Sequence, residues 1–461
     1  MASVAYDAVI IGSGQAAGPL ATSLERAGRR TVLVEAVHIG GTCINEGCTP
    51  TKTMIASARV AYLARRAAGY GVVTGPIGVD MTVVRKRKRD IVDDFRDGST
   101  QAILDGNVEI LSGEASFTAP DHVLVRSPDG DRELTAPLVV INVGARPARP
   151  PIPGLDSVAA LDSTSIMELD HVPEHLIAVG GGYIGVEFGQ MFRRFGSRVT
   201  VIQRGPRLLP REDADVADAI ASVLAEDGLE LLLDVEVLSV APAPGGGVGV
   251  TVRRADGSTR TCHGSDLLVA IGRTPNTDRL NLGAAGVRTD ERGFIVVDDR
   301  LQTNVAGIYC VGDAKPGPAF THISYDDFRV LRTNLVEGGS ATIAGRLVPY
   351  CVFMDPQLAS VGLTESAARA EGRNVRVARL DMSRVARTRE TAEPRGFMKA
   401  LVDADTGLVV GFTILGLEGG ELMSAMEIAM LGGLRYTQLR DAIFAHPTLM
   451  EGFNNLFSSL G

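Results

Sequence analysis

The sequence predicts an α/β fold with two Rossmann-like units, because the chain twice runs from an apolar strand through a glycine-rich turn into a helix and a second strand. The first such segment covers residues 7–35 and the second covers residues 176–203. A third observation concerns the segment from Val348 onwards, where strands such as 400–402 and 408–415 alternate with helical stretches and no further glycine fingerprint occurs. We therefore expect two nucleotide-binding units followed by a separate α+β module.

Length and composition describe a folded, multidomain protein. The 461 residues are too many for a single compact core, and about 150 residues per domain suggests about three domains. Hydrophobic residues at 45% and charged residues at 22% exclude a disordered or fibrous protein. The formal net charge of -9 argues against nucleic acid as a partner. The apolar runs are strand-length and no basic leader precedes the first strand, so we expect a cytoplasmic protein with no membrane partner.

One local exception to the acidic balance is the run of five basic residues at 85–89. It is followed at helical spacing by the acidic residues Asp90, Asp93 and Asp94. We interpret the run as a solvated helix face, and an anion-binding patch is the alternative.

The first glycine fingerprint, G-x-G-x-x-A, consists of Gly12, Gly14 and Ala17 after the apolar strand 8–11. The first glycine permits a tight turn, the second lets a pyrophosphate approach the backbone, and the third position lets the helix pack closely on the strand. The helix N-terminus then faces the phosphates. Glu35 ends the second strand, and its carboxylate can accept hydrogen bonds from ribose hydroxyls, which fits a dinucleotide such as FAD.

The second fingerprint, G-x-G-x-x-G, consists of Gly180, Gly182 and Gly185. At the offset of Glu35 stands Gln203, whose amide does not repel a 2′-phosphate, and the following Arg204 and Arg207 can attract one. This favours NADPH, with NADH still possible. Ordinary glycine-rich turns are the alternative for either motif alone, but two motifs in the same strand–turn–helix context imply two dinucleotides.

Two of the five cysteines stand in a context that favours redox chemistry. Cys43 and Cys48 are separated by four residues, and Pro50 suits the first turn of a helix that begins near Cys48. The positive end of that helix, together with Lys52, lowers a thiol pKa and favours the thiolate. For the spacing alone, a metal site or two buried thiols are alternatives. We interpret the others as small apolar core residues, namely Cys262, Cys310 and Cys351.

Motifs along the whole chain resemble those of the pyridine nucleotide-disulfide oxidoreductases. Besides the two fingerprints they are GGTCINEGCTPTKT at 40–53, AIGRTPN at 270–276, the Gly-Asp pair after Cys310, DPQLASVGLTE from Asp355 and HPTLME from His446. The resemblance implies two Rossmann-like dinucleotide-binding domains, for FAD and NAD(P)H, plus a C-terminal α+β dimerisation domain. It also implies a homodimer whose active sites are shared between the subunits. The implied limits are 1–150 and 276–345 for the two parts of the FAD-binding domain, 151–275 for the NAD(P)H-binding domain and 346–461 for the dimerisation domain.

The same resemblance implies catalytic roles for six residues. Cys48 is the thiol next to the flavin, and Cys43 is the outer thiol that exchanges with the substrate. Lys52 lies near the flavin ring and pairs with Glu187 where nicotinamide meets flavin. His446 is the acid–base residue that protonates the leaving thiol, and Glu451 is the carboxylate that orients it. Both come from the partner subunit.

The resemblance also implies a set of cofactor contacts and no metal site. For FAD these are Gly12, Gly14, Ala17, Glu35, Gly41, Thr42, Lys52, Gly144 and Asp313. For NAD(P)H they are Gly180, Gly182, Tyr183, Gly185, Glu187, Gln203, Arg204, Gly272 and Arg273. Tyr183 is expected to cover the nicotinamide pocket, and the carboxylate of Asp313 suits a polyol hydroxyl.

The expected activity is that of an FAD-dependent NAD(P)H:disulfide oxidoreductase, in which hydride passes from NADPH through FAD to a Cys43–Cys48 disulfide and on to a low-molecular-weight disulfide. The segments FMDPQLASVGLTE and MEGFNNLF resemble mercuric reductases, so reduction of mercuric or other metal ions is an alternative. However, no cysteine follows Glu451 and His446 is present, and both features favour a disulfide. FTHISYDDFR at 320–329 resembles a branch of flavoprotein reductases linked to oxidant or metal stress. A redox-sensing flavoprotein, or direct reduction of quinone or oxygen by the flavin, is also compatible with the sequence.

Overall fold

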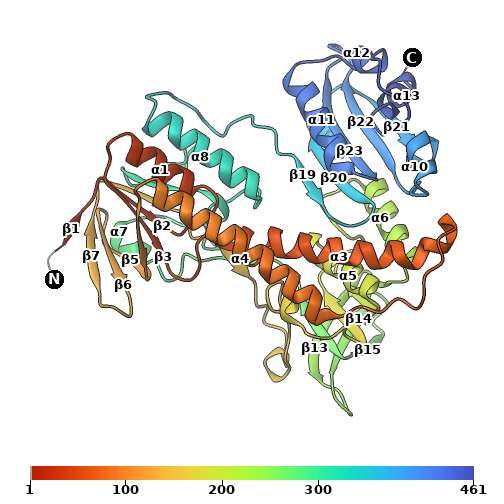
Figure 1. Ribbon diagram of the computed structural model, residues 1–461, viewed down its shortest axis with the longest axis horizontal. Helices are drawn as coiled ribbons and strands as arrows, with labels where there is room; N and C mark the ends of the chain where they lie inside the picture. The colour runs from red at the N-terminus through yellow and green to blue at the C-terminus, as the bar shows by residue number, and fades with distance from the viewer. Residues whose placement is uncertain (1–2, 461) are drawn as a thin grey trace. The chain divides into compact units, whose positions relative to one another are not determined.

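Two compact units make up the computed structural model, which describes residues 3–460 (Figure 1). The first unit consists of the described residues up to Met54, Thr82–Ala148 and Gly272–Arg346. The second unit consists of Ile55–Met81, Arg149–Ile271 and the described residues from Leu347 onwards. Helix α3 (Cys48–Arg66) begins in the first unit and ends in the second. Within the described range, no helix has the length and apolar character needed to span a membrane.

A five-stranded parallel sheet forms the centre of the first unit. Its strands lie in the order β18, β8, β2, β3, β4, which are Ile308–Cys310, Leu138–Ile141, Ala8–Ile11, Thr31–Glu35 and Glu109–Ser112. All residues of β2 and β8 are apolar and buried, which is typical of parallel strands covered on both faces. Because the strands are parallel, their carboxyl ends share one edge of the sheet, the edge at which nucleotides bind in such folds.

The rest of the first unit surrounds this parallel sheet. A second sheet has the order β1, β7, β6, β5, which are Val4–Ala5, Arg132–Thr135, His122–Arg126 and Glu114–Ala119. An antiparallel pair is formed by β9 (Ala145–Pro147) and β17 (Arg273–Pro275). The α-helices that lie wholly or mainly in this unit are α1 (Ala17–Arg26), α2 (Gly41–Asn45), α4 (Met81–Asp105), α7 (Leu282–Ala285) and α8 (Thr321–Leu335).

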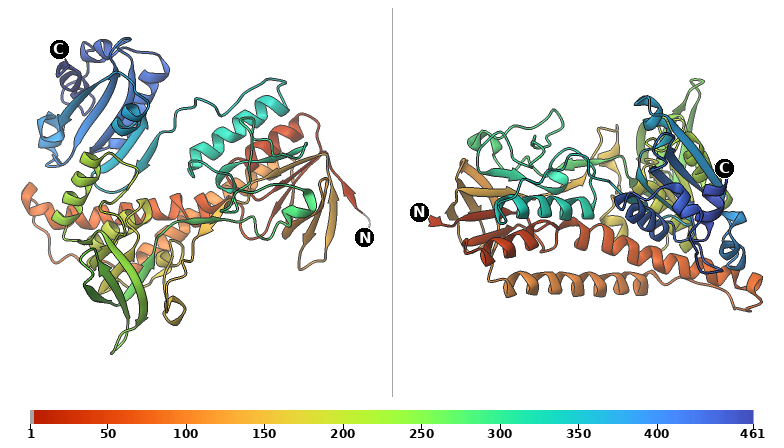
Figure 2. Two further views of the ribbon diagram at one scale, coloured as in Figure 1. Left: turned by 180° about the vertical axis from the view of Figure 1, so that it is seen from behind. Right: turned by 90° about the horizontal axis from the view of Figure 1, so that it is seen from above.

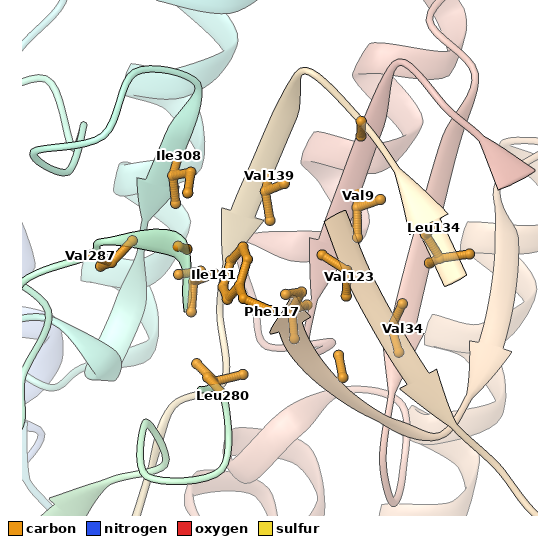
Figure 3. Packing of buried hydrophobic residues seen from close by; sticks show 14 of the residues in the cluster. Val9, Val34, Phe117, Val123, Leu134, Val139, Ile141, Leu280, Val287 and Ile308 are labelled. Carbon is orange, nitrogen blue, oxygen red and sulfur yellow. The ribbon is translucent and has the colours of Figure 1, made fainter. Parts of the chain in front are cut away.

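Alternate residues of the parallel strands pack into two different cores. On one face, Ala8 and Ile10 belong to a core shared with helices α1 and α8. On the other face, Val9 and Ile141 pack against the second sheet, whose Phe117 lies among them (Figure 3). The parallel sheet is therefore held between a helical layer and a second sheet, which fixes the positions of its carboxyl ends.

A four-stranded parallel sheet carries the second glycine fingerprint in the second unit. Its order is β12, β11, β10, β16, which are Glu230–Leu232, Arg198–Ile202, His175–Val179 and Asp266–Val269. It is accompanied by α5 (Tyr183–Phe195), α6 (Ala214–Glu226) and an antiparallel sheet of β13 (Val235–Pro242), β14 (Val248–Arg254) and β15 (Thr259–Gly264). The fingerprint lies between β10 and α5, as expected, and the strand begins one residue earlier than the sequence pattern indicates.

A five-stranded antiparallel sheet forms the C-terminal part of the second unit (Figure 2). Its order is β19, β20, β23, β22, β21, which are Tyr350–Val352, Gln357–Gly362, Val409–Gly416, Phe397–Asp403 and Val375–Asp381. The helices of this part are α9 (Glu365–Ala370), α10 (Ala386–Glu390), α11 (Gly419–Leu431), α12 (Tyr436–Arg440) and α13 (Gly452–Ser458). Helix α11 packs against β20 and β23, and α13 packs against β21 and β22. This is the α+β module expected from Val348 onwards, and the predicted fold class is confirmed.

The interpretation of the basic run 85–89 as a solvated helix face is partly wrong. The run lies on α4, as its spacing indicates, and three of its five side chains are exposed, with Lys86 paired to Asp90 at 2.6 Å. Lys88 is instead buried. It lies four residues before the buried Val92, and residues at this spacing share one face of a helix.

Candidate active site

The cysteine pair lies where two helices of the first unit begin. Cys43 lies in the short helix α2, and Cys48 is the first residue of α3, as the sequence predicts. The Cys48 sulfur is 3.3 Å from the hydroxyl oxygen of Thr321, which is the first residue of α8. The positive ends of α3 and α8 therefore meet at this sulfur, an environment that favours a thiolate. Sequence reasoning did not identify Thr321.

The two sulfurs are electrostatically coupled. Both side chains are present as thiols. The pKa of Cys43 is raised well above its ordinary value, mainly by its hydrogen bond with Cys48 and then by burial, and Thr321 and Lys52 act in the opposite direction. The second proton of the pair must leave next to the charge on the other sulfur, which explains the direction of the shift.

The expected FAD residues of the first unit gather at the carboxyl edge of its parallel sheet. Gly12 follows β2 in a left-handed conformation, and a Cβ there would lie 2.5 Å from the carbonyl oxygen of Asn142. Glu35, at the end of β3, accepts a hydrogen bond from the backbone N–H of Ser13 at 2.9 Å, so its carboxylate is aimed at the fingerprint turn. A Cβ on Gly41 would lie 2.8 Å from Cα of Gly14, which places the chain before Cys43 directly on that turn. This close-fitting backbone suits the approach of a pyrophosphate and fits FAD.

The Gly312–Asp313 turn follows β18 and lies at the same edge of the sheet. The side chain of Asp327 holds this turn in place. Burial raises the pKa of Asp313. Asp327, on α8, is completely buried and accepts a hydrogen bond from the backbone N–H of Gly312 at 2.9 Å. Its carboxylate also pairs with the buried Lys315 at 3.1 Å and with Arg346 at 2.8 Å. Two cations therefore compensate the buried charge that positions Asp313. Sequence reasoning missed this group, because its members are far apart in the chain.

Replacing Asp327 with asparagine is expected to destabilise the protein by about 3 to 5 kcal/mol, because the buried Lys315 would lose the carboxylate with which it is paired. Urea unfolding followed by circular dichroism measures this loss. The matched control is Asp326→Asn, since Asp326 is only half-buried and lies 3.3 Å from Arg346. That change is expected to cost less than about 1 kcal/mol. Equal losses in the two variants would contradict the role assigned to Asp327.

The second fingerprint repeats the construction of the first. Gly180 is in a left-handed conformation, and a Cβ there would lie 2.3 Å from the carbonyl oxygen of Ala270. The backbone N–H of Gly181 donates to Oε1 of Gln203 at 2.9 Å, as that of Ser13 donates to Glu35 in the first unit. The repeated geometry suits a second dinucleotide in the second unit.

The basic residues after Gln203 have different surroundings. Arg207 pairs with Asp218 at 2.9 Å, whereas the exposed Arg204 has no hydrogen bond or ion pair to any residue between 3 and 460. Gly272 and Arg273 lie in the first unit, where the Arg273 guanidinium donates to the carbonyl oxygen of Ala145. Their expected contact with NAD(P)H stays a prediction.

Tyr183, the first residue of α5, belongs to a partly buried group that sequence reasoning did not identify. Its ring stacks on that of Tyr350 with centroids 5.8 Å apart. Both hydroxyls donate to the carboxylate of Glu212, at 3.3 Å from Tyr183 and 2.8 Å from Tyr350. Burial raises the pKa of Glu212, and burial together with the carboxylate raises the pKa of Tyr183 to about 12. The group holds the tyrosine ring at the start of the helix that follows the fingerprint.

Lys52 and Glu187, the expected pair, belong to different units. Glu187 lies on α5, is buried, and accepts a hydrogen bond from the backbone N–H of Phe353 at 2.7 Å. Lys52 lies on the first turns of α3. Their pairing stays a prediction.

His446 and Glu451 are brought together in the second unit. Nδ1 of His446 lies 2.8 Å from Oε2 of Glu451, and a carboxylate accepts a hydrogen bond from a ring N–H. The His446 side chain is 71% exposed. The segment before it is fixed by Asn454, which donates to the carbonyl oxygens of Leu439, Arg440 and Ala442. The geometry leaves Nε2 as the nitrogen that can exchange a proton with another group.

The remaining three cysteines pack in or against hydrophobic cores. Cys262 and Cys310 are buried in hydrophobic cores, as expected, and burial raises the pKa of both thiols. Cys351 is half-buried and packs against the core of the C-terminal sheet.

Comparison with known proteins identifies the family. Residues 6–327 match the family model of pyridine nucleotide-disulphide oxidoreductases, and residues 348–457 match the dimerisation domain of the same family. A probable pyridine nucleotide-disulfide oxidoreductase of Escherichia coli (strain K12), RclA, is 38% identical over 98% of this chain and 99% of its own length. A mercuric reductase of Bacillus cereus is 35% identical over 97% of this chain and 70% of its own length.

A solved structure agrees with these matches. It is the Cu(II) complex of the HOCl-induced flavoprotein disulfide reductase RclA from Escherichia coli, with a TM-score of 0.89 and 37% identity over the whole of both chains. The expected enzyme class, the FAD cofactor and the use of NAD(P)H are thereby confirmed, and the dimerisation domain indicates a homodimer. The chain therefore belongs to the pyridine nucleotide-disulfide oxidoreductase family.

Proposed function

We propose that this enzyme uses NADPH to reduce a low-molecular-weight disulfide, with Cys43 as the attacking thiol and Cys48 as the resolving thiol. The observation that carries the proposal is the His446–Glu451 pair, which places an exposed, oriented imidazole next to the C-terminal helix α13. Thiol–disulfide exchange needs an acid that protonates the leaving sulfur at neutral pH, and histidine meets that need. Reduction of a metal ion has no leaving thiol to protonate.

The proposed thiol–disulfide exchange takes place in two steps. His446 takes the proton of Cys43, whose sulfur attacks one sulfur of the substrate disulfide, and the other sulfur leaves as a thiol that takes this proton from His446. Cys48 then attacks the Cys43 sulfur of the mixed disulfide, which releases the second substrate thiol and forms a Cys43–Cys48 disulfide. FAD, when bound, relays two electrons from the nicotinamide to this disulfide. The helix ends at Cys48 and Thr321 favour the thiolate needed for the second step.

The proposed site is shared between the subunits of the homodimer, with His446 and Glu451 acting on the cysteine pair of the partner chain. The side chains of Ile428 on α11 and Ile443 before His446 support a dimer surface in this region, since they are apolar and 72% and 101% exposed. We also propose that the domain limits are those expected from the sequence, because each expected domain has its own sheet. A cytoplasmic location completes this proposal.

A trapping experiment tests the exchange step. In Cys48→Ser, the mixed disulfide on Cys43 cannot be resolved, so reaction with a substrate disulfide is expected to add one substrate thiol per chain, measured by intact mass. Peptide mapping is expected to place the added mass on Cys43. The control Cys43→Ser keeps Cys48 at the start of α3 and is expected to gain no such mass at a comparable rate. Rapid addition of substrate thiol to Cys43→Ser, with no added mass on Cys43 in Cys48→Ser, would reverse the roles of the two thiols.

The preference for NADPH is assigned to Gln203 and Arg204. Replacing Arg204 with alanine is expected to raise the KM for NADPH about tenfold, or about 1.4 kcal/mol, with little change for NADH, because a hydrogen bond to the 2′-phosphate would be lost. Steady-state kinetics with both nucleotides measures this. Arg207→Ala is the comparison and is expected to have a smaller effect, since Arg207 is paired with Asp218. An equal rise in KM for NADPH and NADH would contradict the assignment.

Reduction of a metal ion is the second candidate. It is favoured by two relatives, a mercuric reductase and an RclA whose structure is a Cu(II) complex. In this case the ion would be a substrate that accepts electrons from Cys43 and Cys48, and His446 would have no part in the reaction. The effect of replacing His446 on turnover therefore distinguishes disulfide reduction from metal-ion reduction.

A further inference from the structure

The side chain of Asn142 has a buried donor without an acceptor. Asn142 directly follows β8 and is 4% exposed. Its Nδ2 is buried and has no hydrogen-bond partner among residues 3–460. An unsatisfied buried donor destabilises the folded state, and buried polar groups in native proteins nearly always have a partner. The structure therefore points to an acceptor that the chain itself does not supply.

The carboxamide of Asn142 lies between two glycine turns of the first unit. Its Nδ2 is 2.9 Å from the position that a Cβ on Gly14 would occupy, and its Oδ1 is 2.9 Å from the corresponding position on Gly312. The backbone of Asn142 is fixed by the parallel sheet, since its N–H donates to the carbonyl oxygen of Ile11 at 2.8 Å. The side chain is thus held at one place, where the carboxyl ends of β2, β8 and β18 meet.

The position of this donor matches one segment of FAD. The second glycine of such a fingerprint lacks a side chain so that the pyrophosphate can approach the backbone, and Nδ2 lies on the side of Gly14 where that side chain would stand. Gly312 precedes Asp313, the carboxylate suited to the ribityl hydroxyls. Phosphate and hydroxyl oxygens are the acceptors that FAD presents between these two points, and an amide N–H can donate to either.

We propose that Asn142 is an FAD-binding residue whose Nδ2 donates a hydrogen bond to an oxygen of the pyrophosphate–ribityl segment. The inference rests on the FAD of the family and is independent of the acceptor proposed above. The competing explanation is that the carboxamide only fills the space beneath the two glycine turns. These explanations differ in where a substitution acts. A ligand of FAD affects FAD affinity, whereas a space-filling group affects the stability of the apoprotein.

The test uses the full-length protein with Asn142→Asp, which keeps the shape but replaces the donor with a negative charge, and Asn142→Ser, which is smaller and neutral. The dissociation constant of FAD is measured by flavin fluorescence during titration of the apoprotein, and the melting temperature of each apoprotein is measured alongside. The control is Ser197→Ala in the second unit, because the Ser197 hydroxyl is also buried and without a partner among residues 3–460. Its FAD affinity is expected to equal that of the wild type.

Asn142→Asp is expected to raise the dissociation constant at least about tenfold, and Asn142→Ser to raise it less, with apoprotein melting close to that of the wild type. If Asn142→Asp does not fold, the FAD affinity of Asn142→Ser alone distinguishes the two explanations, because serine is neutral and places no charge next to the two glycine turns. A change in the ³¹P resonances of bound FAD in Asn142→Ser would identify a phosphate oxygen as the acceptor, and unchanged resonances with weaker binding would identify a ribityl hydroxyl. Unchanged affinity in the folded variants would overturn the proposal. So would affinity losses that only follow a loss of apoprotein stability.

Discussion

His446→Gln is expected to lower kcat for a disulfide substrate by about 10²- to 10⁴-fold, the range that general acid catalysis contributes. Glutamine retains a hydrogen-bonding side chain of similar reach but cannot deliver a proton to the leaving thiolate. Reduction of the enzyme by NADPH takes place before the leaving thiol is formed, so its rate is expected to stay the same. Stopped-flow absorbance of the flavin measures the first half of the reaction, and steady-state turnover measures the whole.

Glu451→Gln is the graded comparison for this result. The imidazole is retained in this variant, but the carboxylate that accepts its Nδ1 hydrogen bond at 2.8 Å becomes neutral. We expect a smaller loss than in His446→Gln, again confined to the step with the disulfide. Wild-type turnover in His446→Gln would remove the histidine from the mechanism.

Mixed dimers are expected to regain activity from two inactive parents. If the site is shared, a dimer of one Cys43→Ser chain and one His446→Gln chain contains one site with both changes and one site with neither. Its turnover is expected to be about half that of the wild type, although each parent homodimer is nearly inactive. Co-expression with two different affinity tags and sequential purification isolates this dimer.

A site contained within one chain gives a different outcome. If His446 acted on the cysteine pair of its own chain, each site of the mixed dimer would carry one damaging change, and its turnover would be as low as that of the parents. Dimers of wild-type chains that carry the same two tags are the matched control for any effect of the tags. Low activity of the mixed dimer beside a fully active control would contradict a shared site.

The parts of this protein that the sequence predicts are those encoded by neighbouring residues. The turns at Gly12 and Gly180 each follow a buried strand, and the left-handed backbone at both positions needs glycine. Cys48 stands at the start of a helix, and His446 and Glu451 are close enough in the chain to meet within one loop. Local geometry sufficed to predict these features.

Contacts between segments that are distant in the chain could not be predicted from the sequence. Thr321 reaches the sulfur of Cys48 across 273 positions of the chain, and Tyr350 meets Glu212 across 138. Nothing next to Asp327 indicates that its carboxylate supports the turn at Gly312. Lys88 shows the same limit, since a basic run predicts exposure and only the packing of α4 reveals which of its members is buried. These features depend on tertiary packing, which a single sequence does not display.

The most direct test of disulfide reduction by this enzyme is steady-state NADPH oxidation by the purified protein against a panel of small disulfides, Hg(II) and Cu(II). Wild type, Cys43→Ser and His446→Gln are compared under the same conditions. We expect the wild type to turn over at least one disulfide, and we expect this turnover to collapse in both variants. Turnover with a metal ion alone, unaffected by His446→Gln, would contradict this expectation and make the enzyme a metal-ion reductase.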